Sequence, residues 1–303
     1  MTRSAVVVNP AKVDDLAARR REICDELAQA GWPEPLWFET TEDDPGRGQA
    51  RRAVEAGAEV VFVCGGDGTV MATLSVLAGT DVAMCVLPSG TGNLLARNLG
   101  LPDDAAAGVR LATRGERRRI DVGRVDDQYF AVMAGIGFDA RMIQDADHRA
   151  KARWGWPAYV FSALRHLRDD PIEFSIRLDR GQELTRRAQA VLISNVGRLQ
   201  GGVVLLPEAE PDDACLDVAV LTPRRPRDWL VMALRLLFRR APGQHVETFR
   251  ARHVEVTTAA PQPCELDGDE IDPRRQLVVD IAPSALLLCV ARAGRTGDLE
   301  EAA

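Results

Sequence analysis

Apolar residues follow two different spacings along the first 100 residues of the chain. Short continuous apolar runs alternate with segments in which apolar positions recur every three or four residues. Continuous runs are typical of strands buried on both faces of a parallel sheet, and the longer spacing is typical of amphipathic helices. The pattern predicts strands at residues 5–9, 36–39, 59–64 and 82–87, and helices at residues 14–30, 46–56, 70–77 and 93–99. This alternation indicates βαβ units and therefore an α/β domain with a parallel sheet.

The pattern changes near Asp121, where short strand-like runs bounded by turn residues begin to dominate. Strands are predicted at residues 122–125, 129–134, 173–178, 188–195, 216–221, 253–258, 265–266 and 276–281, with helical segments at 158–168 and 229–240. Many short strands with frequent turns are typical of an antiparallel sandwich or barrel. The chain is therefore predicted to form two domains, an α/β domain over residues 1–121 and a β-rich, sandwich-like domain over residues 122–282.

Composition and charge exclude several classes of function. Of the 303 residues, 46% are hydrophobic and 27% are charged, and the formal net charge is −7. This is the composition of a soluble globular protein, and its acidity argues against a nucleic-acid partner. No apolar run approaches the roughly 20 residues of a membrane-spanning helix, and no signal-peptide pattern precedes the first strand. The six cysteines include no C-x-x-C pair, so a zinc site is not expected. We expect a cytoplasmic protein.

The most informative motif is the glycine turn Gly65-Gly66-Asp67-Gly68-Thr69, which follows an apolar strand and opens a helix. Such a turn directs unpaired backbone N–H groups and the helix dipole at a ligand, which favours phosphate. An aspartate among these amides would repel phosphate unless a cation bridges the two. Asp67 therefore indicates a site for a nucleotide with Mg²⁺, an ion that binds through water and one or two carboxylates.

A second glycine turn, Pro88-Ser89-Gly90-Thr91-Gly92-Asn93, occupies the same strand-to-helix junction one βα unit later. Asn9-Pro10 ends the first strand at the same edge of the predicted sheet. Ligands of open α/β sheets bind at the carboxyl ends of the strands, so the three turns are expected to converge on one crevice. By contrast, the G-x-G-x-x-A pattern at residues 135–140 lies in the β-rich half, and we interpret it as a turn and not as a dinucleotide fingerprint.

Two acidic clusters lie in the β-rich half. Residues 264–271 place four carboxylates around Gly268, which is either an ordinary acidic hairpin or the source of the base that phosphoryl transfer requires. Asp212, Asp213 and Asp217 lie beside Pro211 and offer oxygen ligands to a hard cation.

Taken together, the motifs resemble the diacylglycerol kinase catalytic family, which includes bacterial soluble lipid kinases and sphingosine kinases. The resemblance spans about residues 4–291 and rests on G-G-D-G-T, P-S-G-T-G-N, I-D-V-G at 120–123, G-I-G-F-D at 135–139 and L-D-G-D-E at 266–270. It implies an N-terminal α/β nucleotide-binding domain with a parallel sheet, followed by an all-β-rich, sandwich-like domain for the lipid acceptor. It also implies that a last segment, at about residues 283–295, returns to the first domain.

The resemblance further implies roles for individual residues. ATP would be bound by residues at the ends of the N-terminal strands: Asn9, Pro10, Thr40, Gly65, Gly66, Asp67, Gly68, Thr69, Ser89, Gly90, Thr91 and Asn93. Asp67 would act through Mg²⁺, and Asp121 would join the magnesium–water network. Related bacterial lipid kinases hold a second, structural Mg²⁺ with an aspartate and two carbonyls. Here that implies Asp213 with the main chains of Glu210 and Cys215.

One departure from the family pattern concerns the catalytic base. The family motif is D-G-E, whose glutamate is the base, whereas this chain reads Asp267-Gly268-Asp269-Glu270. The base is then either Asp269, which is one methylene shorter, or Glu270, which is one residue later. Successive residues of a strand point to opposite faces, so the two cannot serve equally. Position in the motif favours Asp269.

The sequence thus predicts an ATP- and Mg²⁺-dependent lipid kinase that phosphorylates the hydroxyl of diacylglycerol or a similar lipid alcohol. Two alternatives stay open: an NAD kinase-like enzyme, because that related family shares the G-G-D-G turn, and a non-catalytic nucleotide- or lipid-binding protein. Helix 229–240, with Arg239 and Arg240 at its end, either contacts a membrane surface peripherally or packs on the β-rich domain. The sequence is also compatible with a homodimer.

Overall fold

The computed structural model describes residues 2–137, 171–197, 205–223, 225–237, 243 and 245–292. The chain divides into two compact units, one formed by Met1–Ile120 with Ser284–Ala303 and the other by Asp121–Pro283. Within the described residues, no helix is both long enough and apolar enough to cross a lipid bilayer.

The first unit is built on a parallel sheet. Its strands are β1 (Ser4–Val8), β2 (Leu36–Glu39), β3 (Val60–Gly65), β4 (Ala83–Pro88) and the last residues of β14 (Asp269–Val290), in the order β14-β4-β3-β1-β2. All residues of β1, β3 and β4 are buried, as expected for strands covered on both faces.

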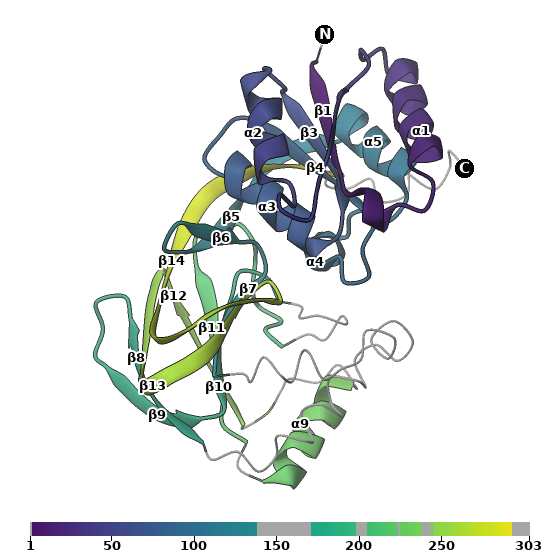
Figure 1. Ribbon diagram of the computed structural model, residues 1–303. Coiled ribbons are helices and arrows are strands. Elements are labelled where there is room, and N and C mark those ends of the chain that lie inside the picture. The colour runs from purple at the N-terminus through teal and green to yellow at the C-terminus, as the bar shows by residue number, and fades with distance from the viewer. Residues whose placement is uncertain are drawn as a thin grey trace. The chain divides into compact units, whose positions relative to one another are not determined.

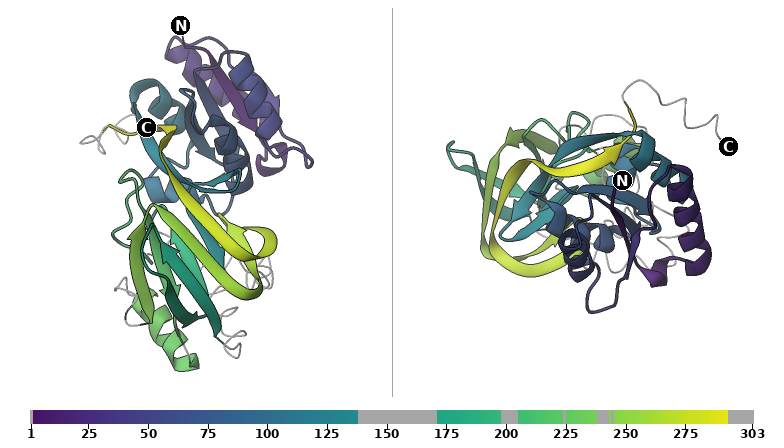
Figure 2. Two further views of the ribbon diagram at one scale, coloured as in Figure 1. Left: turned by 90° about the vertical axis from the view of Figure 1, so that its left-hand side faces the viewer. Right: turned by 90° about the horizontal axis from the view of Figure 1, so that it is seen from above.

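Helices cover both faces of this sheet (Figures 1 and 2), α1 (Leu16–Gln29) and α5 (Ala105–Arg114) on one, and α2 (Arg47–Glu55) and α3 (Asp67–Leu77) on the other. The remaining helices are the short α4 (Leu94–Leu99) and the 3₁₀ turn Pro10–Lys12. Ile23 and Leu27 of α1 and Val109 of α5 are fully buried against Phe62 and its neighbours in the sheet. Each such aliphatic side chain stabilises the fold by about 1.5–3 kcal/mol.

The second unit is a β-rich, sandwich-like domain of mainly antiparallel strands. They are β5 (Glu116–Val125), β6 (Gln128–Phe130), β7 (Met133–Ile136), β8 (Ile172–Leu178), β9 (Leu184–Ala188), β10 (Ala190–Ser194), β11 (Leu216–Leu221), β12 (Val246–Ala251), β13 (His253–Leu266) and β14. The order β12-β11-β10-β7-β13-β14 forms the main path, with β8 and β9 added at β13 and β6 at β5. The described part of this unit has one helix, α9 (Pro226–Leu237).

This architecture confirms the predicted fold class, an N-terminal α/β domain with a parallel sheet followed by a β-rich, sandwich-like domain. Several elements differ from the sequence prediction. Helix α5, with the sequence AAAGVRLATR, and strands β9 and β12 were not predicted. The predicted strand 276–281 is part of the 22-residue β14, where Pro273 and Pro283 suggested breaks. The predicted helix at 158–168 and residues 238–240 lie outside the described residues.

Candidate functional site

Three loops of the first unit begin where neighbouring parallel strands end. Val8 of β1 is in register with Cys64 of β3, and Gly65 of β3 is in register with Pro88 of β4. The structure therefore brings together most of the residues predicted to bind nucleotide: Asn9, the 65–69 turn and the 88–93 turn. Thr40, which follows β2, is buried and donates its backbone N–H to Val8 at 2.8 Å. Pro10 opens the 3₁₀ turn that follows β1.

Asn9 links the first loop to the first glycine turn. Its side-chain oxygen accepts the N–H of Ala11 at 3.0 Å, and its Nδ2 donates to the Thr69 hydroxyl at 3.4 Å. Thr69 in turn lies so close to Gly65 that a Cβ at that position would come within 2.7 Å of the threonine side chain. The turn therefore requires glycine at position 65 for steric reasons.

The two glycine turns pack backbone against backbone. A Cβ on Gly90 would lie 2.7 Å from the Cα of Gly66, which no side chain tolerates. Ser89 donates its N–H to the carbonyl of Gly65 at 3.0 Å, and its hydroxyl lies 3.4 Å from Cys64 Sγ. This close approach explains the glycine at position 90, and the main chains of the two turns lie against each other.

The side chain of Asp67, in the first glycine turn, forms hydrogen bonds with the backbone at the end of the second turn. Its carboxylate accepts the backbone N–H of Asn93 at 2.9 Å and that of Leu94 at 2.6 Å. Burial raises the pKa of Asp67, and these amide hydrogen bonds act in the opposite direction. Each carboxylate oxygen has a second lone pair, so the residue can still accept a hydrogen bond from the water shell of a cation.

Asn93 fixes the conformation of the second turn. It has a left-handed backbone with a φ of 48°, which asparagine tolerates better than most residues. Its side chain accepts the N–H of Gly90 at 3.0 Å and donates to the carbonyl of Gly90 at 2.9 Å. Thr91 is exposed at the tip, where Arg97 donates to its carbonyl at 3.2 Å. Thr91 and the exposed Gly68 are therefore accessible to a ligand.

The second unit holds the remaining predicted magnesium residues. Asp121 is 2% exposed; its backbone N–H donates to Pro211 at 2.7 Å and its carboxylate accepts the N–H of Ala214 at 2.6 Å. Asp213 accepts the N–H of Cys215 at 2.9 Å and forms an ion pair with Arg250. Asp121 and Asp213 thus organise the loop at residues 211–215 from its two sides.

Arg250 is a positively charged neighbour of the 211–215 loop, where the structural Mg²⁺ was predicted. The guanidinium faces both Asp213 and Asp217, and its Nε lies 3.6 Å from the Asp217 carboxylate. Both oxygens of Asp213 are therefore engaged, and Arg250 competes with any ion for this carboxylate. Within the described ranges, no group of three or more His, Cys, Asp or Glu side chains is arranged to hold a metal. An ion held mainly by water and nucleotide phosphates needs no such group.

The acidic hairpin between β13 and β14 turns through Asp267 and Gly268, whose φ values are 51° and 91°. An Asp-Gly pair with two positive φ angles is typical of a tight two-residue hairpin. Asp267 is 4% exposed, and its carboxylate accepts the N–H groups of Ala131, Val132 and Met133 at 2.8, 2.9 and 2.7 Å. Asp267 therefore fixes the segment that leads into β7, a role that the sequence did not reveal.

The two predicted bases lie on opposite faces of this hairpin. Asp269 is the cross-strand partner of Leu266, and Glu270 is the partner of Glu265. Directly opposed residues of an antiparallel pair project to the same face. Asp269 therefore shares a face with a buried leucine, whereas Glu270 shares the other face with a second carboxyl group. Both predicted bases are exposed.

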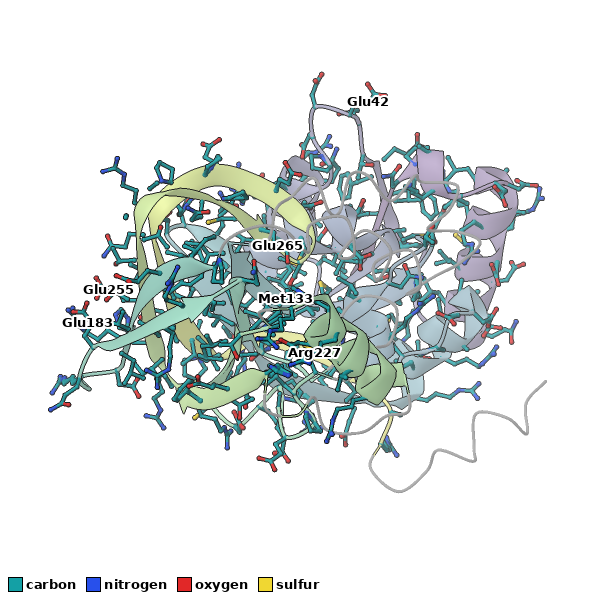
Figure 3. All side chains as sticks on the ribbon, turned by 90° about the horizontal axis from the view of Figure 1, so that it is seen from below. Glu42, Met133, Glu183, Arg227, Glu255 and Glu265 are labelled. Atoms are coloured by element: carbon teal, nitrogen blue, oxygen red, sulfur yellow. The ribbon has the colours of Figure 1, made fainter. Side chains whose placement is uncertain are left out.

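Glu265 is the functional candidate that the sequence analysis left unassigned. It is 8% exposed, and burial, followed by the nearby Asp267, Asp269 and Glu270, raises its pKa to about 7. Figure 3 labels it together with Met133 of the neighbouring strand β7. Its place within a run of acidic residues was visible in the sequence, but the depth of its burial was not.

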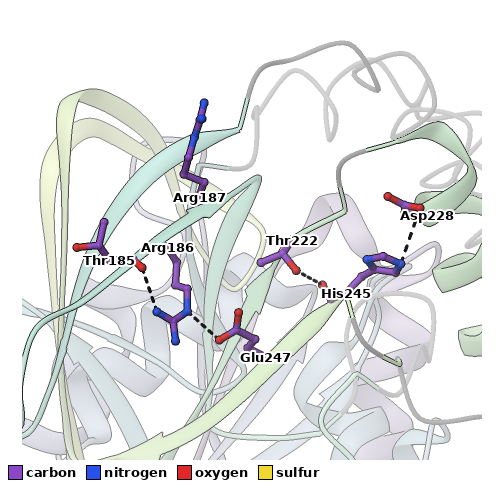
Figure 4. A pocket seen from close by; sticks show the side chains of 7 residues that line it. All are labelled: Thr185, Arg186, Arg187, Thr222, Asp228, His245 and Glu247. Atoms are coloured by element: carbon purple, nitrogen blue, oxygen red, sulfur yellow. Dashed lines mark hydrogen bonds and ion pairs between the residues drawn. The ribbon is translucent and has the colours of Figure 1, made fainter.

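A cavity of about 480 Å³ lies elsewhere in the second unit (Figure 4). Arg186 pairs with Glu247 at 2.8 Å across it, and His245 lies 3.8 Å from Asp228. None of the predicted site residues lines it. Its lining residues are Thr185, Arg186, Arg187, Thr222, Asp228, His245 and Glu247.

Comparisons with known proteins show the family of the chain. Residues 3–125 match the diacylglycerol kinase catalytic domain, and residues 131–290 match the YegS C-terminal NAD kinase beta sandwich-like domain. The chain is 33% identical over 216 residues to a diacylglycerol kinase of Mycobacterium tuberculosis, covering 67% of this chain and 68% of the relative.

Solved structures show the same fold. A diacylglycerol kinase from Bacillus anthracis is similar with a TM-score of 0.73 at 20% identity, covering 95% of this chain and 96% of the other. An NAD kinase from Archaeoglobus fulgidus in complex with ATP is similar with a TM-score of 0.53 at 15% identity, covering 94% and 93%. At these identities the likeness establishes the fold alone.

Proposed function

Because the chain belongs to the diacylglycerol kinase family, we propose that it is an ATP- and Mg²⁺-dependent lipid kinase that phosphorylates the hydroxyl of diacylglycerol or a similar lipid alcohol. The observation that carries this proposal is the pair of interlocked glycine turns held together by Asp67. Their main-chain groups and the start of α3 suit the phosphates of a nucleotide.

In this proposal the first unit positions ATP. Asn9, Pro10 and Thr40 line the ends of β1 and β2, and the 65–69 and 88–93 turns, including Ser89, Gly90 and Thr91, receive the phosphates. Mg²⁺, when bound with ATP, neutralises charge on the phosphates during transfer. Asp67 and Asp121 would orient its water shell. The turns contribute by holding amide dipoles fixed before the reaction begins.

In this proposal the second unit binds the lipid acceptor and supplies the catalytic base. A carboxylate of the 265–270 hairpin takes the proton of the lipid hydroxyl; the motif offers Asp269 by position and Glu270 one residue later. Glu210, Asp213 and Cys215 are the proposed ligands of a structural Mg²⁺, with Arg250 as the competing cation. A kinase with a lipid acceptor has to act at a lipid surface. We therefore propose a peripheral membrane contact through α9, where Val231 is 48% exposed. We further propose that two copies of the chain form a homodimer.

Transfer of ³²P from γ-labelled ATP to a mixed lipid extract, followed by mass spectrometry of the product, tests the proposal. A Mg²⁺-dependent lipid phosphate supports it and identifies the acceptor. NAD⁺ supplied in parallel tests the NAD kinase-like alternative, which the fold likeness to NAD kinases keeps relevant. Tight binding of ATP or lipid without turnover of either acceptor would instead establish a non-catalytic binding protein.

A further inference from the structure

Two cysteines that are far apart in the sequence are neighbours in the first unit. Met84 of β4 and Leu288 of β14 are partners in the parallel ladder between these strands, and Cys85 and Cys289 follow them directly. Neighbouring strands lie about 4.7–4.9 Å apart, which is within the Cα separation of about 4.4–6.8 Å that disulfides span. The backbone therefore places the two cysteines at a distance that a disulfide can bridge.

Both thiols lie on the face of the sheet that packs against α5. Cys85 is 0% exposed and Cys289 is 1% exposed, and both belong to the core cluster that contains Val109 of α5. The Cys85 thiol donates to the carbonyl of Gly108, also in α5, at 3.3 Å. The two cysteine side chains are in hydrogen-bonding contact with each other as well, and both are free thiols. The pair therefore consists of two reduced sulfur atoms that need only a small movement to form a bond.

The two sulfur atoms differ in reactivity. The hydrogen bond with Cys85 lowers the pKa of Cys289, burial acts in the opposite direction, and the Arg117 guanidinium adds to the lowering. The same hydrogen bond, together with burial, raises the pKa of the Cys85 thiol well above its ordinary value. The thiolate is the nucleophilic form of cysteine. Cys289 is therefore the thiol that reacts first, and Cys85 is the neighbour that resolves the product.

A small reagent can reach these thiols when the end of β14 opens locally. The ladder between β14 and β4 consists of the pair Leu288–Met84, whereas β3 and β4 are joined by six consecutive pairs from Val60–Ala83 onward. Segments held by few contacts open at a lower free energy than the core strands of the same fold. Local separation of β14 from β4 therefore exposes both sulfur atoms without unfolding the rest of the sheet.

We propose that Cys85 and Cys289 are an oxidation site, at which a peroxide converts the two thiols to a disulfide that ties β14 to β4. The first unit is assembled from two separate segments of chain, Met1–Ile120 and Ser284–Ala303, and the disulfide joins them covalently. It stabilises the unit, because a cross-link restricts the unfolded chain. Neither cysteine belongs to the residues proposed for kinase function, so this inference goes beyond that function and does not depend on it.

The proposed step conserves atoms and electrons. The Cys289 thiolate forms a bond to one oxygen of hydrogen peroxide, the O–O bond breaks, and the leaving hydroxide combines with the proton that Cys289 released. The sulfur of Cys85 then forms a bond to the sulfenic sulfur of Cys289, the S–O bond breaks, and the hydroxide leaves as water with the Cys85 proton. Together the two sulfur atoms lose two electrons, and the peroxide is reduced to two molecules of water.

The test maps the disulfides of the reduced full chain after treatment with hydrogen peroxide, once folded and once unfolded in urea. Remaining thiols are alkylated, and the peptides are identified by mass spectrometry with fragmentation, because Cys64 and Cys85 lie on one tryptic peptide. In the folded protein we expect the Cys85–Cys289 cross-link to exceed every other cysteine pair by at least about 10-fold, since proximity raises the effective concentration of the thiols. This preference should disappear in urea, and dithiothreitol should reverse the cross-link.

Urea denaturation of the peroxide-treated protein tests the effect of the cross-link on stability. Peroxide should raise the urea midpoint of the parent, and Cys289→Ala should lack both the cross-link and this rise. Cys264→Ala is the matched control, because Cys264 is also buried, at 3% exposure, but has Ile136 and Ile271 as its cross-strand partners. This control should form the Cys85–Cys289 cross-link as the parent does.

A Cys85–Cys289 cross-link that is no more abundant in the folded than in the unfolded protein would overturn the proposal. An unchanged urea midpoint after full cross-linking would overturn the stabilising role of the disulfide. Both results come from the parent protein, so they decide the question even if Cys289→Ala does not fold. Neither measurement uses lipid or ATP, so this inference and the proposed function fail independently of each other.

Discussion

The carboxylate of Asp67 accepts the backbone N–H of Leu94 at 2.6 Å, although the two residues belong to consecutive βα units. The same carboxylate accepts the N–H of Asn93 at 2.9 Å. An acidic residue of the first glycine turn therefore fixes the start of the helix that follows the second. Any change at Asp67 is expected to alter the geometry of both turns together with the local charge.

Asp67→Asn tests this double role. The amide keeps one acceptor oxygen but presents an NH₂ group to the second backbone N–H, so one hydrogen bond is lost together with the charge. We expect kcat for phosphoryl transfer to fall by at least about 100-fold and stability to fall by about 1–2 kcal/mol. The measurements are the labelled-ATP assay and urea denaturation.

Asp44→Asn is the matched control for this variant. Asp44 also accepts two backbone amides in the first unit, those of Gly46 and Gly48 at 3.3 and 3.1 Å, but it belongs to no predicted site. It should lose a similar amount of stability and keep its activity. An Asp67→Asn protein with more than half the parental kcat would show that the charge of Asp67 has no catalytic role.

Asp267→Asn is expected to destabilise the second unit by about 1.5–3 kcal/mol, because a buried carboxylate that accepts three amides becomes a neutral group with fewer acceptor sites. Urea denaturation measures the loss. Asp179→Asn is the control, since Asp179 also has a positive φ, of 51°, and accepts the N–H groups of Arg252 and His253 at 2.8 and 2.9 Å on an exposed turn. Equal losses in the two variants would contradict the importance of burial at Asp267.

Arg250→Gln tests whether an arginine or a divalent ion neutralises Asp213 and Asp217. Removing the guanidinium leaves two neighbouring carboxylates without a cation, so the melting temperature in EDTA should fall. Millimolar Mg²⁺ should restore part of the loss in the variant and leave the parent unchanged. Arg186→Gln, which breaks a single pair with Glu247, should show no response to Mg²⁺. A parent protein that is stabilised by Mg²⁺ as strongly as the variant would favour the bound ion over Arg250.

The raised pKa of Glu265 predicts a pH dependence of stability that needs no assumption about activity. The pKa of about 7 in the folded protein exceeds the ordinary value of 4.5, so the folded state binds this proton more tightly than the unfolded state. The contribution is complete below pH 4.5 and is lost as the pH rises through 7. It amounts to about 3 kcal/mol over that window.

Glu265→Gln should therefore remove this slope, and its advantage over the parent in stability should grow from pH 5 to pH 8. Urea denaturation at several pH values measures the difference. Glu255→Gln, whose wild-type side chain is paired with an arginine, should not reproduce the effect. Parallel pH profiles for Glu265→Gln and the parent would contradict the raised pKa.

The fold class was accessible from the sequence because the apolar runs of β1, β3 and β4 are continuous and are followed by turns, Asn9-Pro10 after β1 and glycine turns after β3 and β4. The sequence missed α5, which buries Ala105, Gly108, Val109 and Leu111, and it divided β14 at its prolines. Of the candidate site, it identified the glycine turns, since close backbone approach demands residues without a Cβ. It did not identify Asp267 or Glu265 as special among the acidic residues of one hairpin.

By itself the sequence determined the two-domain architecture, the three loops at the strand ends and the kinase family, because these depend on local periodicity and on residue types with few steric alternatives. The tertiary structure decided the hydrogen-bond partners and the charged neighbours of each carboxylate. Asp67 bonds amides of another βα unit, Asp213 faces Arg250 from another strand, and Glu265 is set opposite Glu270 and above Gly135. Burial and the proximity of donors or charges control how a carboxyl group behaves, and both are created only when distant segments pack together.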